Sequence, residues 1–347
     1  MMGKLFVAVC LVLALSLPAE ALELTAPTVP TSGAAWMPEQ TQNLGDAAAE
    51  ILTAALGRIR PDLREAMVSC TGVLAGVLAL ALLSAIPGHK GGTVELAGVL
   101  AVGGLLLGTA NAMISLAADT VGELSQYGRL LLPVMTAALA AQGGLTSSAA
   151  LYTGTAVFDA ILSTLIADLL VPLTYFFLAL GMGAGALAQP LLKKLRDTVR
   201  GLSVWCLKTI LYVYTGYISI TGVVSGTTDA GVLKAAKLTI SGMVPVVGSI
   251  LSDASEAVLV SAGTVKNVAG IYGLVAILAV WIGPFFKIGL HYLILKALGM
   301  VCSVFGIKSV TDLIGDFSAA MGLLLAMIGA VCLMLMISTV CFMKGVG

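Results

Sequence analysis

Long apolar runs without charged side chains constrain this sequence more than any other feature. Met67 to Ile86 gives 20 successive uncharged residues, and the 58 residues from Leu130 to Leu187 contain only Asp159 and Asp168 as charges. A helix needs roughly 20 apolar residues to cross the hydrocarbon core of a bilayer. With 59% hydrophobic and only 10% charged residues, the chain has too much apolar surface for one water-soluble core. The sequence therefore predicts an all-α, polytopic integral membrane protein.

The first 21 residues have the pattern of a signal peptide. A basic start at Lys4 precedes the apolar run Leu5–Leu17, and Ala19-Glu20-Ala21 has the small-x-small pattern of a cleavage site. We predict cleavage after Ala21, with an uncleaved anchor helix as the alternative. In both cases the following segment starts outside the cytoplasm.

Residues 22–66 are predicted to form an extracytoplasmic lead-in that ends in an amphipathic helix. Apolar residues recur at helical spacing from Asp46 to Glu65, with Arg58, Arg60 and Arg64 between them. Such a helix can lie at the membrane surface with its arginines against lipid headgroups, or it can pack on the protein's own membrane domain. Residues 67–347 are predicted to form that polytopic domain.

The membrane domain is expected to make about six to eight crossings, with broken or re-entrant segments. The acidic stretch Asp119–Tyr127 is predicted to be an outer loop, and the Gly/Thr-rich stretch Ser225–Gly231 another. Four basic residues place the loop Gln189–Gly201 in the cytoplasm by the positive-inside rule, namely Lys193, Lys194, Arg196 and Arg200.

Two interrupted apolar segments limit how the middle of the chain can cross. Leu130–Leu187 fits either three tight passes or one pass with a re-entrant hairpin, and both Pro133 and Gln142-Gly143-Gly144 interrupt its first part. A similar interruption occurs at Pro245 in the second half of the chain. Paired interruptions can mark an internal repeat around a site at the bilayer midplane, although two examples can also arise by chance.

The second interrupted segment, Leu238–Glu256, is too short and too broken to cross as one helix. Pro245 and Gly248 interrupt its apolar run. Asp253 and Glu256 have the spacing of a capping box, so we expect a half-helix, a polar turn and a new helix from Asp253.

Charged residues within apolar segments are candidates for function, since a carboxylate at a helix centre costs about 2.5 to 3.5 kcal/mol on insertion scales. Asp159 and Asp168 lie nine positions apart and face opposite ways on an unbroken α-helix. One hypothesis pairs Lys208 with either carboxylate inside the bundle; the alternative places the acids at interfaces or helix ends and lets the lysine reach the headgroups. The candidate functional residues are Asp159, Asp168, Lys208, Pro245, Gly248, Asp253 and Glu256.

Several classes of function find no support in the sequence. There is no catalytic motif, so we expect no enzymatic activity. The six cysteines are scattered without metal-ligand spacing, so we expect no metal or other cofactor, and the zero net charge gives no reason to expect nucleic acid. The lipid bilayer is the expected partner, and the 40 glycines suit a tightly packed bundle or a homo-oligomer.

Three stretches resemble a known family. These are RLLLPVM from Arg129, the Gln142-Gly-Gly break, and AKLTISGMVPVVGSILSDA from Ala236. The chain is similar in them to the stage III sporulation protein AE family of endospore-forming bacteria. The resemblance runs from about Met67 to the C-terminus, and VPVVGSILSDA is its most specific part.

The resemblance implies a multi-pass protein of the mother-cell membrane around the forespore. Its implied partners are the other proteins of the stage III sporulation A operon and the forespore stage II sporulation protein Q. It implies a secretion-like channel complex for late forespore development, in which this chain is the permease-type component. A membrane scaffold and an independent ion-coupled secondary transporter are the alternatives. The family provides no catalytic residues to carry over.

Overall fold

The computed structural model describes residues 27–38, 44–84, 91–243 and 248–344, and all regular elements in these ranges are helices. The predicted signal peptide, residues 1–21, lies outside the described residues. The prediction of an all-α polytopic protein is confirmed. The elements are α2 (Thr31–Ala34), α3 (Leu44–Ser84), α4 (Gly91–Ala141), α5 (Leu145–Thr164), the π-helical turn η1 (Leu165–Leu170), α6 (Val171–Leu187), α7 (Pro190–Met243), α8 (Gly248–Ser303) and α9 (Lys308–Lys344).

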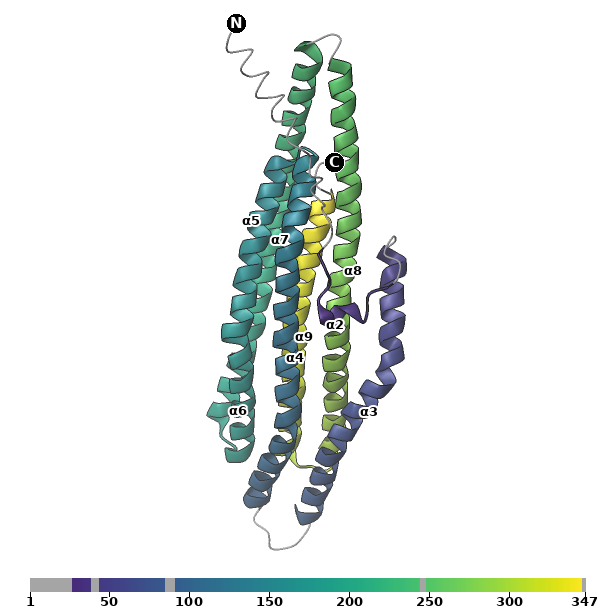
Figure 1. Ribbon diagram of the computed structural model, residues 1–347. Helices are drawn as coiled ribbons and strands as arrows, with labels where there is room; N and C mark the ends of the chain where they lie inside the picture. Colours follow the sequence, from purple (N-terminus) through teal and green to yellow (C-terminus); the bar gives the residue numbers. More distant parts are fainter. Residues whose placement is uncertain (1–26, 39–43, 85–90, 244–247, 345–347) are drawn as a thin grey trace.

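The long helices form an elongated bundle and run close to its long axis (Figure 1). α4 and α9 run in the same direction: Ser309 at the start of α9 bonds Glu95 near the start of α4, and Gly128 packs on Leu335 farther along both. α5, η1 and α6 form one continuous antiparallel return beside α4 (Figure 1).

α9 is the central helix of the described bundle. It contacts α4, α5, α6, α7 and α8, and a row of its side chains has no exposed surface. This row comprises Met321, Leu324, Met327, Ile328 and Val331. The high apolar content of Ser318–Met343 therefore serves packing between helices as well as contact with lipid.

Five helical segments of the described chain are long and apolar enough to cross a membrane. They are Leu44–Leu83, Glu95–Ala141, Leu145–Leu187, Lys266–Ser303 and Lys308–Lys344, against the six to eight crossings expected. Each segment has 37 to 47 residues and therefore measures about 55 to 70 Å at a rise of about 1.5 Å per residue. This length exceeds the hydrocarbon core of about 30 Å, so each helix has room for polar turns beyond its spanning part.

The excess length explains why three predicted loops are wrong. Asp119–Tyr127 lies in the middle of α4, and Ser225–Gly231 lies within α7. The basic stretch Gln189–Gly201 is also helical from Pro190 onward, because α7 begins there. The two carboxylates of the first stretch accept hydrogen bonds without a loop, since Ser115 donates to Asp119 and Ser32 donates to Glu123. The expected helix start at Asp253 is also wrong, because α8 already begins at Gly248.

One chain turn occurs where the sequence indicates it. Gln142–Gly144 separates α4 from α5, with Gly143 at φ 90°, a backbone conformation that glycine adopts without steric cost. Pro133 does not interrupt α4. The 130–187 segment therefore contains the end of α4 and one continuous return, instead of three tight passes.

The predicted amphipathic helix is the first half of α3, and it packs on the protein itself. Ala47, Ile51 and Ala55 are buried against Val275, Ala279 and Ile282 of α8. α3 then continues without a break through the expected domain boundary at residue 66. Of the two alternatives for this helix, the structure has the one packed against the membrane domain.

Candidate functional site

Asp159 on α5 is a carboxylate inside the bundle, with 2% of its surface exposed. The Ser125 hydroxyl of α4 donates a 3.0 Å hydrogen bond to its Oδ1. Arg129 Nε, also from α4, lies 3.9 Å from Oδ2, and the Arg129 side chain is 67% exposed. The carboxylate is therefore held between α4 and α5 by one hydrogen bond and one long ionic contact.

Further polar side chains lie about one helical turn away. Thr155 of α5 shares a 2.7 Å hydrogen bond with Ser338 of α9. The Tyr214 hydroxyl of α7 donates to the Met334 carbonyl at 3.2 Å. Buried polar groups of this kind are almost always paired, and here the pairs join four helices. We call this set the polar layer: Ser125, Arg129, Thr155, Asp159, Tyr214 and Ser338.

A π-helical turn follows Asp159 on the same helix. The Val171 N–H donates to the Ile166 carbonyl, five residues earlier. Pro172 comes next, and it has no N–H for the carbonyl of Asp168 four residues before it, while its ring clashes with that carbonyl in a regular α-helix. The wider turn relieves this conflict, and such π-turns are frequent at functional sites.

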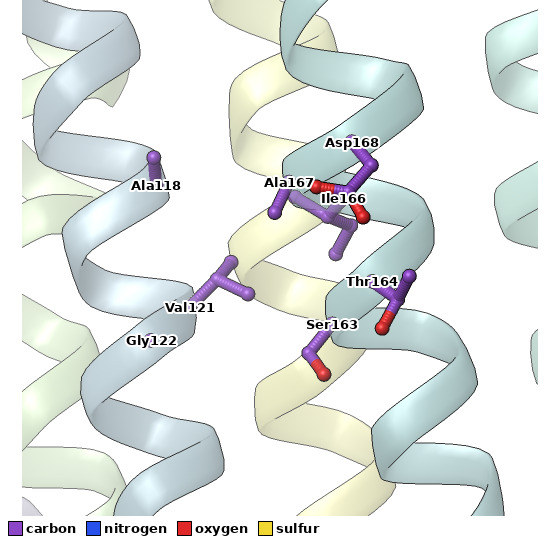
Figure 2. A pocket seen from close by; sticks show the side chains of 8 residues that line it. All are labelled: Ala118, Val121, Gly122, Ser163, Thr164, Ile166, Ala167 and Asp168. Carbon is purple, nitrogen blue, oxygen red and sulfur yellow. The ribbon is translucent and has the colours of Figure 1, made fainter.

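A pocket of about 230 Å³ lies beside the π-helical turn, between α4 and the helix that carries Asp168. Figure 2 shows its side chains on the two facing helices. It combines apolar side chains with two hydroxyls and a carboxylate. The lining residues are Ala118, Val121, Gly122, Ser163, Thr164, Ile166, Ala167 and Asp168.

Asp159 and Asp168 both lie beside α4, but at different depths. Asp159 is buried and accepts from Ser125 of α4, whereas Asp168 is exposed and lines the pocket together with Val121 of α4. The expected opposite orientation applied to an unbroken α-helix, and the π-helical turn, which begins at Leu165 and contains Asp168, changes the rotation. Asp159 does not line the pocket itself, so the two carboxylates are neighbours along one seam and not a single pair.

The proposed pairing of Lys208 with Asp159 or Asp168 is wrong for the described residues. Lys208 is exposed on α7, and the ionic partner of Asp159 is Arg129. Arg129 is the first residue of the motif RLLLPVM, but its contact with the Asp159 carboxylate depends on the packing of α4 on α5, which the sequence does not reveal.

The remaining predicted site residues belong to the α7–α8 connection. Pro245 lies outside the described residues. Gly248 begins α8, and Asp253 and Glu256 follow within it, but the side chains of these positions are also outside the described part. Their proposed role therefore stays a prediction.

A second polar cluster, at the start of α7 and α9, was missed by sequence reasoning. Arg196 Nη1 lies 2.8 Å from Asp316 Oδ2, and Lys193 Nζ lies 3.3 Å from Asp312 Oδ2. Burial lowers the pKa of the Arg196 guanidinium, but Asp316 and Asp197 raise it by more, so its pKa lies above the ordinary value. One signal in the sequence was available. Asp312 and Asp316 are four residues apart and so lie on the same side of a helix, where they can meet two basic residues of a neighbouring helix.

Comparison with known proteins agrees with the resemblance of the sequence motifs. A sequence model described as stage III sporulation protein AE matches residues 63–345. The chain belongs to the stage III sporulation protein AE family. The match covers the second half of α3 and all described helices after it, so both the polar layer and the pocket lie in the family's common region, whereas α2 and the first half of α3 lie outside it.

A curated member of the family from Bacillus subtilis (strain 168), named stage III sporulation protein AE, is 24% identical over 184 residues. The aligned part covers 53% of this chain and 46% of the relative, so the chain matches about half of that protein's length. No solved structure matches the chain. The chain is therefore a sporulation protein with the helices of a membrane protein.

Proposed function

We propose that this protein is the permease-like component of a channel complex between mother cell and forespore, required for late forespore development. In this proposal it lies in the mother-cell membrane around the forespore and has no enzymatic activity. Its partners are the other stage III sporulation A proteins and the stage II sporulation protein Q of the forespore. The family assignment supports a role in sporulation, and the polar layer supports a role in transport.

The observation that carries the transport function is the burial of Asp159. A charged side chain within a membrane bundle is costly, and such residues commonly mark paths of ions or substrates. Arg129, which is 67% exposed and 3.9 Å away, compensates its charge only in part. A helix bundle that served packing alone would gain stability from an apolar residue at this position.

The seam between α4 and α5 is the proposed mobile element. The π-helical turn gives this seam an irregular point next to the pocket, because the helix can move between i→i+5 and i→i+4 hydrogen bonding there. Such a change rotates the helical segment that carries Asp159 relative to the segment that carries Asp168. Access of water to the seam is therefore the property to measure.

The test uses single cysteines in a background without the native ones. Cysteines replace Ala167 at the pocket and Leu324 in the core of α9, and a water-soluble thiol reagent is applied to membranes of sporulating cells with the complex assembled. We expect rapid reaction at position 167 that slows when partner proteins are deleted, and no reaction at 324. The channel proposal fails if position 167 reacts at the same rate with and without the partners, since the seam would then face lipid or solvent independently of the complex.

A membrane scaffold is the second candidate function. The interior of the described bundle is filled, since five α9 side chains between positions 321 and 331 have 0% exposure, so a passage would have to form between chains. A scaffold predicts that neutralising Asp159 leaves spore formation unchanged while the partners still assemble. An independent transporter predicts instead that the purified protein alone carries a solute into vesicles.

A further inference from the structure

A groove of about 690 Å³ lies on the outside of the bundle, between the middle of α3 and the last part of α8. Its walls are mainly apolar: Met67, Val68 and Leu74 line it from α3, and Ile294, Ala297 and Val301 line it from α8. Met67, Val68 and Val301 are among the exposed large hydrophobic residues. Within the described part of the chain, no segment covers this groove.

One end of the groove is basic. Arg60 and Arg64 line it one helical turn apart on α3, and both are exposed. Like charges at this spacing destabilise a helix slightly. Neither makes an ion pair with a carboxylate whose side chain is described, and Asp62 lies two positions from each, where helix side chains do not face each other. Two guanidinium groups thus stand together at the end of an apolar surface.

Three other arginines of the described bundle have a partner, whereas Arg200 on α7 is exposed like Arg60 and Arg64. Arg58 lies 4.3 Å above the ring of Trp36, Arg129 contacts Asp159, and Arg196 is bonded to Asp316. Arg60 and Arg64 differ from Arg200 because they lie one helical turn apart at the end of an apolar groove, where both can donate to the same anion. Guanidinium groups bind phosphate through paired, charge-assisted hydrogen bonds.

The dimensions of the groove suit a lipid. Arg60 and Leu74 are 14 residues apart on α3, which is about 21 Å along a helix. This length is somewhat more than one leaflet of a bilayer, about 15 Å of hydrocarbon. A phospholipid needs this combination, because its phosphate binds a cationic site at one end and its acyl chain needs an apolar surface about as long as one leaflet. A neighbouring apolar helix would instead leave both guanidinium groups unpaired.

We propose that this groove binds one acidic membrane phospholipid, with its phosphate at Arg60 and Arg64 and an acyl chain along the α3–α8 groove. Basic pockets between transmembrane helices bind acidic lipid headgroups in this way. The lipid completes the packing of α3 on α8, where the protein's own side chains leave the groove open. This binding is independent of any transport by the polar layer.

Native mass spectrometry of the full-length protein in detergent tests the proposal, with phosphatidylglycerol and phosphatidylcholine as the two probes. We expect retention of phosphatidylglycerol in preference to phosphatidylcholine. Arg60→Gln combined with Arg64→Gln is expected to weaken phosphatidylglycerol binding at least tenfold and to abolish the preference. Lys194→Gln with Arg200→Gln is the matched control, since it removes two exposed positive charges from another helix and should change nothing.

Two further variants separate the headgroup from the chain. Arg60→Lys with Arg64→Lys keeps both charges and is expected to fold like the native protein and to bind with intermediate affinity. Ala297→Trp places a bulky ring in the apolar part and is expected to reduce binding of both lipids. Equal phosphatidylglycerol binding by the glutamine pair and its control overturns the proposal. Unchanged lipid binding in Ala297→Trp, together with loss of a protein oligomer, would assign the groove to a partner helix.

Discussion

The Arg196 guanidinium of α7 lies 2.8 Å from the Asp316 carboxylate of α9, and Gly181 of α6 packs directly against the same carboxylate. A Cβ at position 181 would come within 2.7 Å of Asp316 Oδ2. Three helices therefore meet at one ion pair whose side chains are only 15% and 11% exposed. The pair ties the start of α7 to the central helix.

Replacing Asp316 by Asn should destabilise the protein, because it leaves the partly buried Arg196 with only the neighbouring Asp197. Breaking a buried ion pair costs about 3 kcal/mol or more. Asp197→Asn is the control, because this carboxylate is 66% exposed and its loss should cost less than about 1 kcal/mol. Unfolding of both variants in detergent by heat or denaturant measures the difference. Equal losses would mean that the Asp316 pair contributes no more than a surface contact.

Gly154→Ala should disrupt the contact between α5 and α7. A Cβ at this position would lie 1.9 Å from Tyr217 Cε1, and the Tyr217 hydroxyl donates to the Ala150 carbonyl at 3.0 Å. Displacing this ring should cost about 1 to 3 kcal/mol. Gly108→Ala is the control, since nothing lies within 4 Å of its added Cβ, and it should stabilise α4 by about 0.5 to 1 kcal/mol. The free energies of unfolding of the two variants should therefore change with opposite signs.

Asp159→Asn separates charge from packing in the polar layer. The amide keeps an oxygen that can accept from Ser125, so folding should stay intact or gain about 1 to 3 kcal/mol once the buried charge is removed. Under the proposed function, the frequency of heat-resistant spores should fall while the amount of protein in the membrane stays the same. Asp119→Asn, at an exposed position of α4, should leave spore formation unchanged. Normal spore formation in Asp159→Asn would favour a scaffold.

Pro172→Ala should remove the cause of the π-helical turn. The new N–H can bond the Asp168 carbonyl, so the helix can return to regular α-helical hydrogen bonding. Asp168 then rotates away from α4 and the pocket closes. A cysteine placed at Ala167 should consequently react with a water-soluble thiol reagent more slowly in the Pro172→Ala background. A reaction rate that does not depend on Pro172 would show that the turn has another origin.

The sequence was sufficient for the class of protein and for its family. Apolar runs of spanning length demand helices in a bilayer, and the motifs from Met67 onward led to the sporulation family that the comparison shows. It also located the turn at Gln142–Gly144, where glycines permit a backbone that other residues avoid. These features depend on local chemistry alone.

Only the tertiary structure decided where polar stretches remain helical and which charges meet. Asp119 and the Ser225–Gly231 stretch lie within long helices, because helices that exceed the bilayer thickness need no loop at a polar turn. Asp159 meets Arg129, and Asp316 meets Arg196, across positions that are far apart in the chain. Such pairs depend on the register and rotation of packed helices. One π-helical turn is enough to change that rotation, and spacing along the sequence does not reveal it.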